Sequence, residues 1–147
     1  MKKVSALGLD VGRKRLGVAG CDGTGLIATG LTTIYRTSWA RDLRQLEDLV
    51  REREVEILVI GLPYKLDGTI GSQAKQVQKF ARKISQSLQL PVEYVDERLT
   101  SIEAEAQLKT LNKFSSRDKG AVDRLAAAII LQQWLDMRRI AQTKNKE

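Results

Sequence analysis

Three acidic residues stand where the sequence would place a charge beside the hydrophobic core. Asp10 ends an apolar run at residues 4–9, and Glu97 closely follows a second apolar run at residues 92–95. Asp123 begins a stripe of apolar residues at helical spacing, so it shares one helix face with them. An ionised carboxylate in such a place is costly unless it is paired or binds a metal ion. We therefore treat these three acids as candidate catalytic residues.

The chemistry that these acids predict is hydrolysis assisted by a hard metal ion. In open α/β sheets, functional groups gather at the carboxyl ends of the strands, so Asp10 and Glu97 meet if their strands lie near one another. Converging carboxylates repel one another, and a divalent cation relieves that repulsion. Oxygen ligands favour Mg²⁺ or Mn²⁺ over zinc. Two such ions, about 3.5–4 Å apart, promote phosphodiester hydrolysis. Asp10, Glu97 and Asp123 are thus predicted as metal ligands as well as catalytic residues.

Each acid also has a simpler interpretation, because a single acid at a strand end is usually a turn or cap residue. Asp96 is an alternative ligand in place of Glu97, or a cap for the turn at Thr100. The glycine-rich loop at residues 61–72 is either a plain connection or a place where backbone N–H groups approach a phosphate. The residues alone leave these alternatives open.

Basic residues flank the acids and are candidates to bind the phosphates of nucleic acid. They are Lys14, Arg15 and Arg98. A solvated hairpin tip is the other interpretation of Lys14 and Arg15. The net charge of +7 agrees with a polyanionic partner, although basicity alone is a weak indication.

Composition excludes several other kinds of site. The chain has no histidine and one cysteine, Cys21, so Ser-His-Asp catalysis, Cys-His catalysis and the usual zinc sites are excluded. Cys21 is expected to be a buried thiol. The N-terminus lacks the apolar segment of a signal peptide, and no stretch is long and apolar enough to span a membrane. We expect a cytoplasmic protein with no membrane association.

The pattern of apolar residues predicts an α/β fold in one domain at residues 1–147, with a short frayed C-terminal tail. We expect strands at residues 4–9, 16–21, 26–34, 57–60 and 92–95. We expect helices at residues 38–53, around 77–88, from Thr100 onwards, and at 121–139. Short turns join the first three strands, which predicts an antiparallel meander. The later strands alternate with helices, which predicts parallel pairing. Together they predict a five-stranded mixed sheet flanked by helices.

Four motifs, in order along the chain, resemble those of the YqgF or RuvX family within the RNase H-like superfamily. They are residues 9–19 (LDVGRKRLGVA), residues 61–63 with 67–69 (GLP and DGT), residues 96–101 (DERLTS) and residues 119–123 (KGAVD). The first is shared more loosely with actin-like kinases, whereas the second and third together are specific.

The resemblance implies a nuclease that matures the end of pre-16S rRNA in ribosome biogenesis, with Asp10, Glu97 and Asp123 as its acids. It favours RNA over DNA as the partner, with ribosomal precursor particles as a further candidate, and leaves monomer or homodimer open. One alternative is a Holliday junction resolvase acting on DNA as a symmetric dimer. Another is a non-catalytic RNase H-like nucleic-acid-binding module, which would gain nothing from clustered negative charge. An actin-like phosphotransferase would need a second domain, for which the chain is too short.

Overall fold

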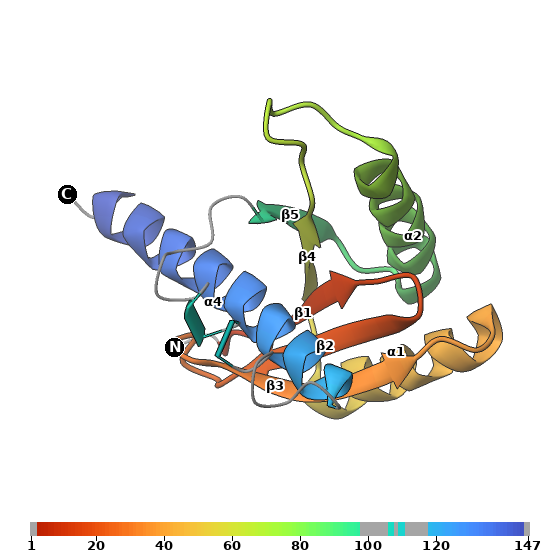
Figure 1. Ribbon diagram of the computed structural model, residues 1–147. Helices are drawn as coiled ribbons and strands as arrows, with labels where there is room; N and C mark the ends of the chain where they lie inside the picture. The colour runs from red at the N-terminus through yellow and green to blue at the C-terminus, as the bar shows by residue number, and fades with distance from the viewer. Residues whose placement is uncertain (1–2, 98–105, 108, 111–117, 146–147) are drawn as a thin grey trace.

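Five strands form one mixed sheet in the order β3-β2-β1-β4-β5 (Figure 1). The computed structural model describes residues 3–97, 106–107, 109–110 and 118–145. Its strands are β1 (Ala6–Val11), β2 (Arg15–Cys21), β3 (Ala28–Tyr35), β4 (Ile57–Leu62) and β5 (Val92–Asp96). β1 pairs antiparallel with β2, and β2 with β3, whereas the β1–β4 and β4–β5 pairs are parallel. The predicted antiparallel meander and parallel half-sheet are confirmed.

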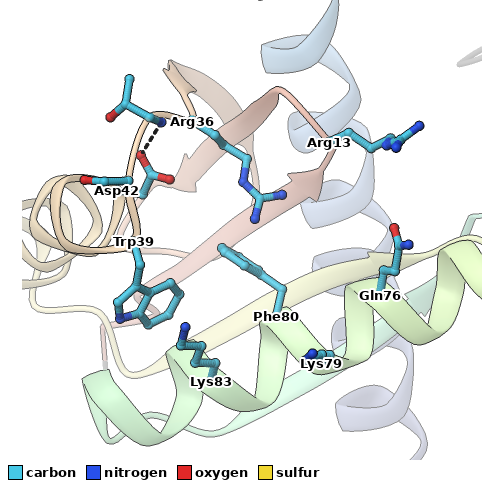
Figure 2. A pocket seen from close by; sticks show the side chains of 10 residues that line it. Arg13, Arg36, Trp39, Asp42, Gln76, Lys79, Phe80 and Lys83 are labelled. Carbon is cyan, nitrogen blue, oxygen red and sulfur yellow. Dashed lines mark hydrogen bonds between the residues drawn. The ribbon is translucent and has the colours of Figure 1, made fainter.

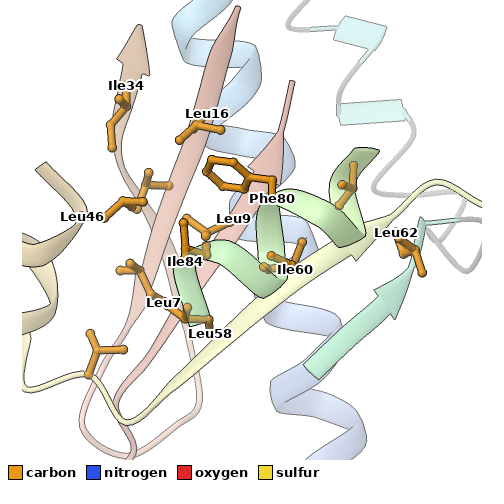
Figure 3. Close-up of a cluster of buried hydrophobic side chains, with 14 of the residues drawn as sticks. Leu7, Leu9, Leu16, Ile34, Leu46, Leu58, Ile60, Leu62, Phe80 and Ile84 are labelled. Atoms are coloured by element: carbon orange, nitrogen blue, oxygen red, sulfur yellow. The ribbon is translucent and has the colours of Figure 1, made fainter. Parts of the chain in front are cut away.

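Helices cover both faces of this sheet. α1 (Trp39–Arg53) and α2 (Ser72–Leu88) cover one face, where they pack on alternate strand residues such as Leu7 and Leu9 (Figure 3). α4 (Lys119–Asn145) covers the other face, on the intervening residues such as Ala6 and Val59. Because side chains alternate along a strand, each acid at a strand end belongs to one face or the other.

α4 lies close to the sheet because the strand residues beneath it are small. A Cβ atom on Gly8 would lie 2.7 Å from Cβ of Leu131, and one on Gly30 would lie 2.9 Å from Cβ of Arg124. A Cβ atom on Gly17 would overlap the backbone carbonyl oxygen of Asp123. The backbone of α4 at Asp123 is therefore held directly against β2.

Several element boundaries differ from the prediction; α2, for example, begins at Ser72 and not near residue 77. Two of the differences have a clear physical cause. β3 begins at Ala28 because the Asp22 carboxylate accepts hydrogen bonds from the backbone N–H groups of Leu26 and Ile27, which extends the turn. α4 continues to Asn145, through most of the predicted tail, because this segment lacks glycine and proline.

Other expectations concern Cys21, the helix expected at Thr100 and membrane-spanning segments. Cys21 is buried, as predicted. The predicted start of a helix at Thr100 lies outside the described residues, although residues 106–107 and 109–110 are helical. No helix in the described part of the chain is both long and apolar enough to cross a membrane.

Candidate active site

Asp10 and Asp123 come together because of strand pairing and the close approach of α4. Asp10, the penultimate residue of β1, pairs with Gly17 of β2. The backbone of Asp123 lies against Gly17, in the first turns of α4. The two acids thus lie on the same face of the sheet, at the carboxyl end of β1.

Glu97 approaches the same place from the other side of β4. The sequence left open whether the strands before Asp10 and Glu97 are neighbours, and the structure places β4 between them. Gly61 of β4 allows Glu97 to reach across this strand because it has no side chain. A Cβ atom there would lie 2.6 Å from Oε1 of Glu97 and 2.5 Å from Cδ1 of Ile130. Parallel pairing of Leu9 with Ile60 brings Gly61 beside Asp10. Gly61 therefore leaves the space that the Glu97 carboxylate occupies.

The electrostatics of these acids agree with this arrangement. Burial, and then the nearby Asp123 carboxylate, raises the pKa of Asp10 to about 6. Burial, followed by repulsion from Asp10 and then Asp96, raises the pKa of Glu97 to about 7. Asp10 is thus the central member, with Asp123 on one side and Glu97 on the other. Such shifted carboxylates are typical of functional sites.

Arg15 provides the positive charge beside these acids. Its Nε donates a hydrogen bond to Oδ2 of Asp123 at 2.6 Å, and 27% and 18% of the respective side chains are exposed. Asp123 therefore points towards the sheet and its site, not to solvent. Arg15, predicted as a phosphate ligand, binds a carboxylate in this structure.

The donor set fits a hard divalent cation. Asp10 and Glu97 are carboxylates whose ionised forms are disfavoured by burial and repulsion, which is the electrostatic environment that a cation would relieve. Their oxygen atoms suit Mg²⁺ or Mn²⁺. Within the described ranges, however, no three acidic or cysteine side chains already form a metal-binding group.

The remaining candidates from the sequence are Lys14, Arg98 and the glycine-rich loop at residues 61–72. Lys14 is exposed in the turn between β1 and β2. Arg98 lies outside the described residues. In the loop before α2, Asp67 accepts hydrogen bonds from the backbone N–H and the hydroxyl of Thr69, which forms a local turn.

Sequence reasoning missed a basic pocket on the opposite face of the sheet. Four cationic residues line it: Arg13, Arg36, Lys79 and Lys83. One signal was available, because residues 72–88 include four lysines or arginines and no acid. The apolar residues of this segment predict a helix, and its basic residues form the side of that helix that the apolar pattern does not describe.

Comparison with known families gives a match over nearly the whole chain. The family model described as "RuvX: Holliday junction resolvase" matches residues 4–137. A protein of Rippkaea orientalis named "Putative pre-16S rRNA nuclease" is 72% identical over 139 residues, which cover 95% of this chain and 100% of that protein. A relative of the same name from Synechocystis sp. is 68% identical over 138 residues, covering 94% of this chain and 91% of its own.

Two solved structures with a similar fold are resolvases. Thermus thermophilus RuvC in complex with a Holliday junction substrate has a TM-score of 0.59 at 14% identity, covering 92% of this chain and 96% of its own. The fowlpox virus resolvase in complex with Holliday junction DNA has a TM-score of 0.54 at 9% identity, covering 91% and 98%. These similarities confirm the RNase H-like fold.

Proposed function

This chain belongs to the RuvX family and is a nuclease, and we propose that it cuts phosphodiester bonds in the precursor of 16S ribosomal RNA. Relatives that share about 70% of its residues over almost its full length carry that name, which supports the choice of RNA. The activity would take place in the cytoplasm, on RNA alone or within ribosomal precursor particles.

The observation that carries the proposal is the position of Asp10 between Glu97 and Asp123. The three acids come from β1, from the residue after β5 and from the first turns of α4. The three acids can approach one another because Gly17 and Gly61 have no side chains; a side chain at either position would occupy the space between these elements. A fold that only bound nucleic acid would gain nothing from buried negative charges that also repel phosphates.

In this proposal the acids bind metal and the neighbouring basic residues bind phosphate. Asp10, Glu97 and Asp123 would hold the divalent cation. A bound Mg²⁺ or Mn²⁺ supplies activation of water and stabilisation of the leaving oxygen. Arg15 fixes the Asp123 carboxylate through Oδ2, and its guanidinium has further N–H groups that can donate to a phosphate. Lys14, exposed one residue earlier, would hold the neighbouring phosphate. For Arg98, the same role rests on the sequence alone.

Cleavage by the purified protein tests the proposal. Labelled precursor 16S rRNA, an unrelated single-stranded RNA and a four-way DNA junction are incubated with the protein in Mg²⁺, Mn²⁺ or excess EDTA. We expect cleavage of the precursor at discrete positions in either metal and none in EDTA. Undiminished cleavage in EDTA would remove the metal from the mechanism. Failure to cut the precursor, with cleavage of another substrate, would remove the assigned substrate.

The four-way DNA junction is the second candidate substrate, because the matching family model is described as a Holliday junction resolvase. A junction presents two equivalent strands, so this activity predicts a symmetric dimer that makes paired cuts. Paired cuts in the junction, together with an intact rRNA precursor, would favour this candidate.

A further inference from the structure

A pocket of about 620 Å³ lies between α1, α2 and the turn that follows β1 (Figure 2). Its lining includes Arg13 and Arg36 on one side, and Lys79 and Lys83 of α2 on the other. A smaller neighbouring pocket shares Arg13 and Arg36 and extends to Val11 and Gly12. Together they form a basic depression that reaches the end of β1, and we call it the basic pocket.

Aromatic rings hold two of these cations in place. Cζ of Arg36 lies 4.9 Å from the centre of the Phe80 ring, and Nζ of Lys83 lies 4.1 Å from the centre of the Trp39 ring. The two rings pack edge to face, with centroids 6.0 Å apart. Nη1 of Arg36 also donates to the carbonyl oxygen of Gly12 at 2.7 Å. These contacts fix the cations at the wall of the pocket, which reduces the entropy lost when they bind a ligand.

The basic pocket has a large excess of positive charge. Among the described residues that line it, Asp42 is the single acid; it is buried and accepts a hydrogen bond from the backbone N–H of Thr37. α2 itself contains Lys75, Lys79, Arg82 and Lys83 and has no acidic residue, so nothing on that helix neutralises the excess. A ligand for this site should therefore be an extended anion.

The basic pocket and the candidate active site share one edge of the sheet. Asp10 faces α4, whereas the next residue, Val11, packs on the side of α1 and α2. Arg13 is three residues after Asp10, so their Cα atoms are separated by at most about 11 Å. A polynucleotide that has a phosphate at the acids can thus cross the edge at Gly12 and reach the pocket within a few nucleotides.

We propose that the basic pocket binds the phosphate backbone of the substrate strand a few nucleotides from the bond that is cut. The identification of the ligand rests on the proposed function, since the strand is that nuclease's substrate. The lysines and arginines contact phosphates and not bases. A base would need an open aromatic ring to stack on, and the rings of Trp39 and Phe80 are covered by cations and by each other. Binding here is therefore independent of base sequence.

Binding measured without cleavage tests this site. The probe is a fluorescent 20-nucleotide single-stranded RNA, titrated in EDTA at several salt concentrations. We expect the K79A/K83A protein to bind on the order of tenfold more weakly, with the slope of log affinity against log salt reduced by about 1.4, or about 0.7 for each lost phosphate contact on a single strand. K79Q/K83Q, which keeps more of each side chain, should lose the same part of the slope.

The matched control is R44A/R51A, which removes two exposed cations of α1 that lie outside the pocket. It should retain the wild-type slope. Equal slopes for K79A/K83A and R44A/R51A would overturn the proposal, as would a wild-type protein that does not bind the strand. The outcome is independent of metal and of cleavage, so a failure of the proposed function would appear in the cleavage assay and not here.

Discussion

Nε of Arg15, at the start of β2, donates a 2.6 Å hydrogen bond to Oδ2 of Asp123, on α4. The bond joins two elements that are 108 residues apart in sequence and meet at the candidate site. It also opposes the repulsion between Asp123 and Asp10, because it places a permanent positive charge beside one member of the pair. One arginine thus contributes to the fold and to the electrostatics of the site.

Replacement of Arg15 by alanine should therefore lower the free energy of unfolding by about 1–2 kcal/mol, the usual contribution of a partly buried, charge-assisted hydrogen bond. Urea unfolding measures this change. The R15A/D123N double variant supplies the control, because its loss should be smaller than the sum of the two single losses. Additive losses would show that the bond contributes nothing.

Neutralising any of the three acids should abolish most cleavage without removing binding. Asp10→Asn, Glu97→Gln and Asp123→Asn keep the side-chain shape but remove a negative charge from the proposed metal site. Cleavage rates should fall at least about a hundredfold, as is typical when one catalytic charge is lost, while RNA affinity holds or rises because repulsion is relieved. The control is Asp48→Asn, an exposed acid on α1. Wild-type cleavage by one of the three variants would exclude that residue from the mechanism.

The stability of the metal-free protein should fall as the pH rises from about 4 to about 7. Burial and mutual repulsion raise the pKa of Asp10 to about 6 and that of Glu97 to about 7, above the values of an unfolded chain. The folded state therefore binds more protons than the unfolded state in this range, so each group favours folding below its unfolded pKa and loses that effect as the pH rises. Asp22, whose pKa is lowered to about 2, acts in the opposite direction and only below about pH 4.

Urea unfolding in EDTA at pH 5 and pH 7.5 measures this dependence. At pH 7.5, Asp10→Asn should be more stable than the wild type by about 1–3 kcal/mol, since one unit of pKa shift corresponds to about 1.4 kcal/mol. Glu97→Gln should behave in the same way. If both variants keep the full pH dependence, the two carboxylates are not its source.

Two glycine-to-alanine substitutions should have different effects because different atoms surround them. At Gly17 the added Cβ meets the backbone of Asp123, which cannot move without shifting α4, so we expect a loss of stability of about 3 kcal/mol or more. At Gly61 the nearest atoms are the ends of the Glu97 and Ile130 side chains, which can rotate away. Gly61→Ala should remain folded but lose cleavage activity, as Glu97 is displaced. Thermal unfolding and cleavage assays together separate these outcomes.

Much of the fold was predictable because its signals are local. Alternation and apolar runs located all five strands, and the change of spacing at Trp39 located α1, whose N-cap Ser38 accepts a hydrogen bond from the backbone N–H of Arg41 as a cap should. Short turns required antiparallel neighbours, and intervening helices required parallel ones. These rules were sufficient for the parallel and antiparallel strand directions of the mixed sheet.

The site was less predictable because its contacts are not local. Nothing in the sequence places β4 between the strands that carry Asp10 and Glu97, or makes Gly61 the gap through which they approach. Arg15 was expected to face solvent or phosphate, and its partner is 108 residues away. Arg36, in the connection between β3 and α1, and Phe80 of α2 are likewise distant in sequence, so the basic pocket forms only when the helices pack on the sheet.

The glycines beneath α4 have a consequence for how this protein can change. Gly8, Gly17 and Gly30 contribute no functional group. Because they have no side chains, however, they determine how closely the helix that carries Asp123 approaches the sheet. In a library that randomises these positions and selects for cleavage, Gly17 should tolerate no replacement, whereas Leu7 and Leu9 on the other face should accept similar hydrophobic residues. A search for essential residues that considered only reactive side chains would overlook the ones that hold the acid in place.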